Sequence, residues 1–390
     1  MRITEREIGY VNEVLRHQFR TTASAGMGGR LETAFAAKFD SGFAIAFANG
    51  TATLHAALAA AGVGPGDEVI VPPLTMAATS LGVLHTGAVP VYADVDPDTW
   101  NLDPRSVQSR LTPRTKAIIP VSLYGLPSDT GPLMALALEK NLFVLEDAAQ
   151  CFLGRNHGKV VGSITHASSF SFQNSKHMSC GEGGMITTND ADLADKIRRF
   201  SCLGYGAVSG GAGKGKISRE TIQDPGYLRH TSIGWNYRLS ELCAAVLLGQ
   251  VERLDELVQE RLDSAQALAE AVAGCAWLIP QKVPAGIEHS YWCYTCRLSD
   301  DVTFSWQDFR RKYLAMGGDG FYGAWAVNYL EPAFRGKRFG DWQTQSLETG
   351  LCPVAERLQP RLMQFKTNYS DPKRRQNAAD AMRKTIAFFS

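Results

Sequence analysis

The chain has 390 residues, with 40 Lys and Arg against 39 Asp and Glu and a formal net charge of +1 at pH 7. A hydrophobic fraction of 45% and a charged fraction of 20% exclude a disordered chain, and 37 glycines without a three-residue period exclude collagen. This length has room for two domains and a large core. The balanced charge gives no overall field that attracts nucleic acid or an anionic membrane, so we expect neither as a partner.

The first residues do not resemble a secretory signal, because Arg2, Glu5, Arg6 and Glu13 interrupt the apolar positions. No later apolar run reaches the roughly 18 residues that a membrane span needs. We therefore expect a cytoplasmic protein.

Eight cysteines are scattered over the chain, unlike the dense framework of a small secreted domain, and we expect them to be reduced. Cys293 and Cys296 form a CxxC pattern inside a strand-like run, where an offset of three places the two thiols on opposite faces. With no second CxxC and no HxxxH, we expect no metal site.

The first half of the chain alternates short apolar runs with longer helical patterns. This order predicts an α/β fold, with a mainly parallel sheet flanked by helices. The expected strands are Phe43–Ala48, Glu68–Val71, Val89–Ala93, Lys116–Ser122, Leu142–Leu145, Ser168–Ser171 and Met185–Thr188. The expected helices are Thr51–Ala61, Thr75–Thr86 and Pro132–Lys140.

The second half begins with a stretch rich in Gly, Ser and Lys, Gly204–His230, which indicates a long surface loop. The later elements are a helical stretch over Ser240–Ala273, a strand over Tyr291–Leu298, and helices over Trp306–Met316 and Arg375–Phe388. We expect a large domain over residues 1–260, including an N-terminal helical segment, and a small α+β domain over residues 261–390.

A candidate anion site lies at Asn49-Gly50-Thr51, between an expected strand and an expected helix. Free backbone N–H groups and the positive end of the helix dipole favour a phosphate there. The alternative is a plain turn in which Asn49 or Thr51 caps the helix.

Asp147 follows the expected strand Leu142–Leu145, and Gln150 comes three residues later. Ligands of α/β sheets bind outside the carboxyl ends of the strands, so this acid would face the expected crevice. An acidic residue at a strand end can equally serve solubility alone.

Lys176 lies between an apolar strand that ends at Ser171 and the glycine turn Gly181–Gly184. Most lysines are solvated surface charges, but a lysine whose pKa is lowered in such a setting can form a Schiff base with a carbonyl. Lys176 is therefore a candidate nucleophile.

Seven sequence blocks, taken together, are more specific than any of these motifs. They are NGTATLHAAL, GPGDEVIVPPLT, GAVPVYADVD, RTKAIIPVSLYG, EDAAQ, SFSFQNSKHMSCGEGG and GWNYRLSEL. In order and spacing they resemble the DegT/DnrJ/StrS family of pyridoxal-phosphate (PLP) sugar aminotransferases. The resemblance is close over Gly28–Leu262 and loose over the remainder, and it implies the aspartate aminotransferase fold.

The resemblance also implies roles for individual residues. Lys176 would hold the cofactor as a Schiff base and move the proton of the reaction, and Asp147 would keep the pyridine nitrogen protonated. Gln150 would contact the ring hydroxyl. The phosphate would be held by Gly50, Thr51 and Ser171, and by Asn236 of the neighbouring subunit in a homodimer with shared sites.

Two positions depart from the family pattern. Met76 stands where an aromatic residue commonly stacks on the cofactor ring, and a polarizable thioether can still cover an aromatic face. His177 is adjacent to Lys176, and dehydratase relatives carry His at the lysine position. Because Lys176 keeps the family spacing from Ser171, the resemblance favours aminotransfer.

The expected reaction is transfer of an amino group from glutamate or glutamine to a keto sugar, most commonly nucleotide-linked, in aminosugar, polysaccharide (lipopolysaccharide) or secondary-metabolite biosynthesis. A free keto sugar or a cyclitol is the alternative substrate. Two alternatives from other classes are a PLP-dependent sugar dehydratase and a non-catalytic PLP-binding regulator.

Overall fold

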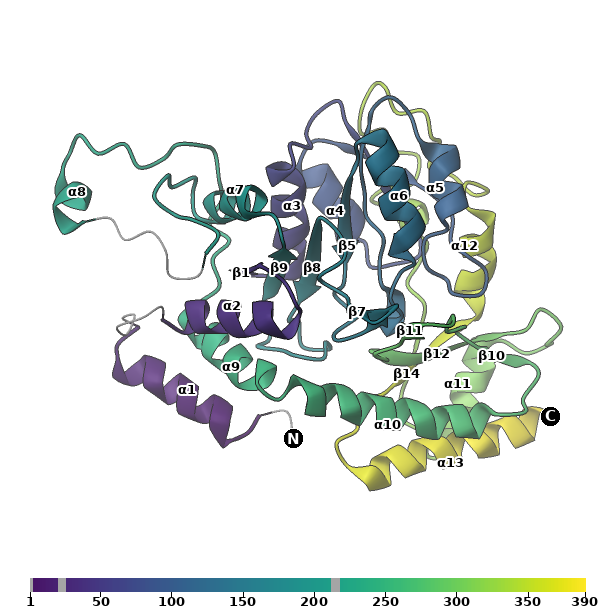
Figure 1. Ribbon diagram of the computed structural model, residues 1–390. Coiled ribbons are helices and arrows are strands. Elements are labelled where there is room, and N and C mark those ends of the chain that lie inside the picture. The colour runs from purple at the N-terminus through teal and green to yellow at the C-terminus, as the bar shows by residue number, and fades with distance from the viewer. Residues whose placement is uncertain (1–2, 20–25, 212–217) are drawn as a thin grey trace.

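A seven-stranded, mainly parallel sheet forms the centre of the computed structural model, which describes residues 3–19, 26–211 and 218–390 (Figure 1). Its strands, in spatial order, are β1 (Phe43–Phe47), β9 (Gly184–Thr188), β8 (Ala167–Ser171), β5 (Phe143–Asp147), β4 (Thr115–Ile118), β2 (Glu68–Val71) and β3 (Val89–Tyr92). Strand β9 runs antiparallel to both of its neighbours, and the pairings among β8, β5, β4, β2 and β3 are parallel. The predicted fold class is confirmed.

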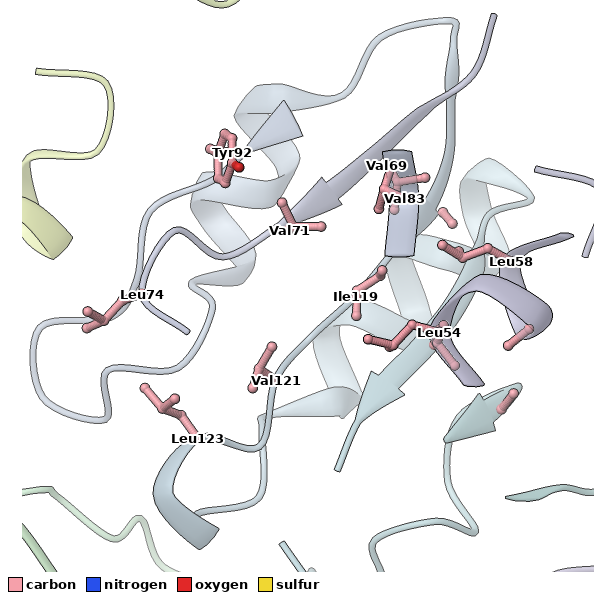
Figure 2. Packing of buried hydrophobic residues seen from close by; sticks show 14 of the residues in the cluster. Leu54, Leu58, Val69, Val71, Leu74, Val83, Tyr92, Ile119, Val121 and Leu123 are labelled. Carbon is pink, nitrogen blue, oxygen red and sulfur yellow. The ribbon is translucent and has the colours of Figure 1, made fainter. Parts of the chain in front are cut away.

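Helices cover both faces of this sheet (Figure 1). Those that precede or follow its strands are α1 (Glu5–Arg16), α2 (Gly26–Lys38), α3 (Gly50–Ala60), α4 (Ala78–His85), α5 (Pro104–Arg110), η1 (Leu123–Gly125), α6 (Thr130–Lys140), α7 (Ala191–Ser201), α8 (Arg219–Gln223) and α9 (Glu241–Val251). Side chains alternate across each strand, so neighbouring residues enter different cores. Val69 packs with α3 and α4, as Figure 2 shows for Leu54, Leu58 and Val83, whereas Ile70 packs on the opposite face against the cluster under α6.

A second sheet forms the centre of the C-terminal part. Its strands are, in order, β10 (Leu278–Pro280), β12 (Cys293–Leu298), β14 (Leu362–Lys366) and β13 (Tyr322–Gly323). The remaining helices are α10 (Leu254–Val272), α11 (Trp306–Ala315), η2 (Asn328–Leu330), α12 (Pro353–Leu358), η3 (Gln359–Arg361) and α13 (Pro372–Phe389). A small three-stranded sheet joins β11 (Ile287–Glu288), β6 (Arg155–Asn156) and β7 (Lys159–Val160).

The C-terminal part also packs against the large sheet and its helices. Tyr329, Phe334 and Leu358 belong to the same buried cluster as α3 and α4 of the large sheet. The carboxylate of Asp94 accepts hydrogen bonds from the N–H groups of Val354 and Ala355 at 2.9 Å each, at the start of α12. The domain boundary expected at residue 260 falls inside α10, and this division stays a prediction.

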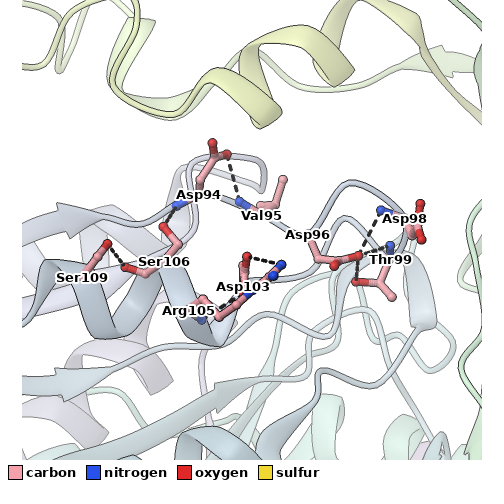
Figure 3. Close-up of polar contacts among 9 residues, drawn as sticks. All are labelled: Asp94, Val95, Asp96, Asp98, Thr99, Asp103, Arg105, Ser106 and Ser109. Carbon is pink, nitrogen blue, oxygen red and sulfur yellow. Dashed lines mark hydrogen bonds and ion pairs between the residues drawn. The ribbon is translucent and has the colours of Figure 1, made fainter.

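The turn after β3 is organised by aspartates (Figure 3). Asp96 accepts hydrogen bonds from the backbone N–H groups of Asp98 and Thr99, and Asp103 caps the start of α5. Short acidic side chains fit such turns because they bond to nearby backbone N–H groups.

The expected single helical stretch Ser240–Ala273 is wrong in one respect, because α9 ends at Val251 and α10 begins at Leu254. Arg253 has non-helical backbone angles (φ −121°, ψ 24°). Its buried guanidinium donates to the buried carboxylate of Glu7 at 2.9 Å. The break thus lets a buried ion pair join α1 to the second half of the chain.

The expected loop Gly204–His230 contains the short helix α8, and its residues 212–217 lie outside the described residues. In the part of the chain that the structure describes, no helix combines the length and apolar character needed to cross a bilayer.

Candidate active site

A cavity of about 460 Å³ opens where β1, β2, β5 and β8 end at their carboxyl edge. The parallel strands bring these ends to one edge of the sheet, the usual place for ligands in α/β folds. Seven of the residues singled out from the sequence line this one cavity: Gly50, Thr51, Met76, Asp147, Gln150, Ser171 and Lys176.

The anion end of the cavity is the start of α3. Asn49 is the N-cap, and its side chain accepts from the N–H of Ala52 at 2.8 Å. The N–H groups of Gly50 and Thr51 begin the helix, where no intrahelical acceptor exists for them. A Cβ on Gly50 would lie only 2.9 Å from Cβ of Ser171, so only glycine fits here without a shift. The helix end and Ser171 therefore form a tight cradle suited to an anion.

Asp147 ends β5 and is one of the residues that line the cavity. Its carboxylate accepts from Thr79 Oγ1 at 2.8 Å and from the N–H of Ala149 at 3.1 Å. Burial raises the pKa of Asp147, although these two hydrogen bonds and the charge of Lys176 favour the ionised form. The carboxylate is thus fixed in position, and a cationic N–H of a bound ring would stabilise its charge.

Gln150 and Met76 occupy different environments. Gln150 is buried, and its Oε1 accepts from the N–H of Tyr124 at 2.7 Å. Met76 is 53% exposed and lies between β2 and α4. The predicted helix Thr75–Thr86 begins only at Ala78, which leaves Thr75 and Met76 in the cavity wall.

Lys176 brings a half-buried amine to the cavity. Burial lowers the pKa of Lys176 to about 8, against the opposing effect of the Asp147 carboxylate. Its Nζ lies 4.6 Å from the ring centroid of Trp292. The neutral amine, which is the nucleophilic form, is thus accessible near neutral pH.

His177 turns away from the cavity. It is buried, stacks on Phe152 with ring centroids 5.2 Å apart, and its Nε2 lies 2.9 Å from the carbonyl oxygen of Ser290. Burial lowers its pKa far below the usual histidine value, so the ring is neutral. Lys176 and not His177 therefore faces a ligand in this cavity.

Two tryptophans of the C-terminal part complete the cavity, and sequence reasoning missed both. Trp292 and Trp325 stack with ring centroids 5.9 Å apart, and Trp325 stacks in turn on Tyr124 at 6.1 Å. Trp292 follows Tyr291, at the start of a predicted strand, so its aromatic character was visible but its position was not. Glu182, in the glycine turn after Lys176, also lines the cavity.

Asn236 does not line the cavity of this chain. It is exposed and forms an isolated bridge with Cys202. Its expected role concerns a second subunit and stays a prediction. Among the described residues, no group of three or more His, Cys, Asp or Glu side chains is arranged to hold a metal ion.

A model of the DegT/DnrJ/EryC1/StrS aminotransferase family matches residues 1–366. This chain belongs to that family. It is therefore an enzyme of the PLP-dependent aminotransferase class, and the resemblance recognised from the seven sequence blocks is confirmed.

Individual relatives agree with this aminotransferase assignment. GDP-perosamine synthase from Caulobacter vibrioides is 41% identical over 274 residues, which cover 70% of this chain and 69% of that protein. UDP-N-acetyl-3-dehydro-alpha-D-glucosamine 3-aminotransferase from Acidithiobacillus ferrooxidans is 36% identical over 317 residues, covering 81% and 76%. The X-ray structure of an aminotransferase from Psychrobacter cryohalolentis matches with a TM-score of 0.85 and 32% identity, covering 99% of this chain and 98% of that one.

Proposed function

We propose that this aminotransferase binds PLP in the cavity and transfers an amino group from glutamate or glutamine to a nucleotide-linked keto sugar. The observation that carries the proposal is the meeting of three groups in one cavity: the start of α3, the Asp147 carboxylate and the Lys176 amine. Bound PLP supplies an electron sink for the bond that breaks at the substrate carbon.

The phosphate of the cofactor would be held at the cradle. The N–H groups of Gly50 and Thr51 and the hydroxyl of Ser171 are donors at the positive end of a helix dipole. The close approach of Gly50 to Ser171 supports this placement, because it brings backbone donors directly to the anion. This chain would therefore anchor the cofactor at its charged end.

The ring would lie between Asp147, Gln150 and Met76. The Asp147 carboxylate, held by Thr79, would accept a hydrogen bond from the pyridine nitrogen and keep it protonated. Gln150 would contact the ring hydroxyl, and the thioether of Met76 would cover one ring face. These contacts orient the ring and tune its electron demand.

Lys176 would attach the cofactor covalently and then move the proton. Its amine, with a pKa lowered to about 8 by burial, can take a proton from the reacting carbon and return it near neutral pH. A lysine at this place favours amino transfer over dehydration, since His177 lies in the core.

The substrate proposal is supported by the names of the relatives, which concern GDP- and UDP-linked sugars. The stacked Trp292 and Trp325 give the cavity an apolar wall on which the C–H face of a sugar ring would pack. We place the chain in a homodimer in which Asn236 of each subunit reaches the phosphate site of the other.

The test uses purified Lys176→Ala beside a control, Lys159→Ala, which removes an exposed lysine of β7. After incubation with PLP and borohydride reduction, the native protein and the control gain one cofactor mass and the Lys176 variant gains none. Amino transfer to a GDP- or UDP-linked keto sugar is lost only in Lys176→Ala. Retention of trapping and transfer in that variant would overturn the assignment.

A further inference from the structure

A buried asparagine of the C-terminal part contacts the segment that forms one wall of the cavity. This wall segment, residues 73–80, runs from the turn after β2 into the first turn of α4, and Thr75, Met76 and Ala78 in it line the cavity. Asn328, the first residue of η2, is 1% exposed and does not line the cavity itself. Asn328 thus adjoins the site without belonging to its surface.

Asn328 makes three hydrogen bonds to the wall segment. Its backbone N–H donates to the carbonyl oxygen of Pro73 at 2.8 Å, and its side-chain amide donates to the carbonyl oxygen of Thr75 at 2.7 Å. Its amide oxygen accepts from Ser80 Oγ at 3.1 Å. Since a carbonyl oxygen can only accept, the Thr75 contact fixes which way the amide points. One side chain therefore bridges the residue before Met76 and the first turn of α4.

The bridge continues to the large sheet. The hydroxyl of Tyr92, the last residue of β3, donates to Ser80 Oγ at 3.1 Å, and Ser80 in turn donates to Asn328. All three side chains are buried. A buried polar network in which each group has its partner is rigid, because breaking any contact leaves an unsatisfied group away from water.

Two groups of the proposed cofactor site depend on this backbone. Met76 directly follows Thr75, and its own side chain is flexible and 53% exposed, so the backbone determines where the thioether lies. Thr79 directly precedes Ser80, and its hydroxyl donates to the Asp147 carboxylate at 2.8 Å. The amide of Asn328 is bonded on both sides of these two residues.

We propose that Asn328 is a positioning residue for amino transfer, which fixes the backbone that presents Met76 and Thr79 to the cofactor. The inference rests on the proposed function, in which the PLP ring lies between Met76 and Asp147. Asn328 contacts neither cofactor nor substrate and acts through the wall segment. Loss of its amide loosens this segment, so that PLP is held less tightly and its ring is less well oriented.

The apolar wall formed by Trp292 and Trp325 is affected less. Trp325 lies three residues before Asn328, and the backbone hydrogen bond from Asn328 to Pro73 does not depend on the side chain at position 328. The inference therefore predicts a fall in kcat with little change in KM for the keto sugar.

The experiment compares Asn328→Leu, which keeps a side chain branched at the same carbon, with the matched control Asn156→Leu. Asn156, in β6, is another buried asparagine whose amide donates to a backbone carbonyl oxygen, that of Ser128 at 3.1 Å, and it does not line the cavity. In Asn328→Leu we expect PLP to bind about tenfold more weakly, kcat to fall about tenfold and KM to change less than about threefold. The visible circular dichroism of bound PLP weakens, and the control keeps the native values of all four quantities.

Two milder variants carry the test if Asn328→Leu does not fold. Ser80→Ala removes one contact of the Asn328 amide and keeps the other, so it shows the same changes at about threefold. Tyr92→Phe removes the hydroxyl at the far end of the network, leaves both amide contacts in place and keeps the native dichroism.

Hydrogen exchange of the full-length protein without added PLP gives a readout that does not depend on the reaction. The amides of residues 75–80 exchange faster in Asn328→Leu than in the native protein or in Asn156→Leu. Native exchange, or native dichroism and kcat in Asn328→Leu, would overturn the inference. A native protein that binds no PLP refutes the proposed function, whereas a native protein that transfers the amino group no faster than Asn328→Leu refutes only the role of Asn328.

Discussion

The amine nitrogen of Lys176 lies 4.6 Å from the ring centroid of Trp292, and the indole N–H of Trp292 donates to the carbonyl oxygen of Ser175 at 2.9 Å. One side chain thus contacts both the ammonium group and the backbone immediately before it. A cation over an aromatic face is stabilised by about 0.5–2 kcal/mol, according to its solvation. Trp292 therefore favours the charged form of Lys176, while burial favours the neutral form.

This balance predicts the pH dependence of cofactor capture by the apoenzyme. Only the neutral amine attacks a carbonyl, so the rate rises with pH up to about 8, the lowered pKa of Lys176, and then levels off. Trp292→Leu removes the contact that stabilises the cation, and the inflection moves down by up to about one pH unit. Trp292→Phe keeps an aromatic face and shifts it less.

Stopped-flow absorbance of the cofactor at a series of pH values measures this rate. An inflection near 10.5, the ordinary lysine value, or an upward shift in Trp292→Leu would contradict the prediction.

Arg261, a residue of α10, also holds the backbone around Lys176 in position. Its buried guanidinium donates to the carbonyl oxygens of Ser175 and Lys176, each at 3.1 Å, and to that of Trp292 at 2.6 Å. It therefore joins the Lys176 loop to Trp292, the residue immediately before β12.

Arg261→Met leaves these carbonyl groups without their donor, and each unsatisfied buried group costs about 1–3 kcal/mol. We expect the thermal midpoint to fall by at least about 5 °C and kcat to fall about tenfold or more, since Lys176 loses its position. Arg383→Met, at an exposed site of α13, is the control. Calorimetry and steady-state kinetics check both effects, and an unchanged kcat would remove Arg261 as a positioning residue.

The cradle at α3 gives a third prediction. Gly50→Ala places a methyl group 2.9 Å from Cβ of Ser171, and overpacking of this kind costs about 1–3 kcal/mol. We expect PLP affinity to fall about tenfold or more. Ser171→Gly removes the Cβ that the new methyl group would meet. In a double-mutant cycle, the loss of PLP binding free energy in the double variant should therefore be smaller than the sum of the losses in the two single variants. Strict additivity in equilibrium dialysis would show that the two residues do not meet.

Local sequence patterns predicted the site residues at the strand ends, but they did not predict that Trp292 and Trp325 line the cavity. Apolar runs such as Glu68–Val71 and glycine-bounded turns specify strand ends, and parallel strands bring those ends to one edge. A parallel sheet therefore already places Gly50, Asp147 and Lys176 at the same edge, close to one another. Trp325 lies far along the chain from Lys176, and no local period indicates the packing that carries it there.

The break between α9 and α10 was missed for the same reason. The apolar period continues through Glu252 and Arg253, and only the ion pair with Glu7 distinguishes this point. Contacts between distant segments determine where such a helix ends. Sequence periodicity describes the pattern within one helix or strand and carries no information about these contacts.

Glu146 precedes Asp147 in β5, and its side chain is fully buried on the other face of the sheet. Ser122 donates to its carboxyl group at 2.5 Å. Burial raises the pKa of Glu146 to about 7, an effect that the Ser122 hydrogen bond opposes and the Asp147 charge increases. In the unfolded chain the same group titrates near 4.5. The folded protein therefore retains a proton between pH 4.5 and 7 that the unfolded chain releases, and stability falls as the pH rises through this window.

Glu146→Gln removes the titration while keeping the shape of the side chain. Relative to the native protein, the variant should gain up to about 3 kcal/mol between pH 5 and pH 8, a relative rise of about 5 °C in the thermal midpoint. Glu256→Gln, at an exposed position of α10, should show no such trend. Thermal scans of the three proteins at both pH values make the comparison. A midpoint difference that stays constant with pH, or that falls, would mean that Glu146 is already ionised in the folded protein at pH 5.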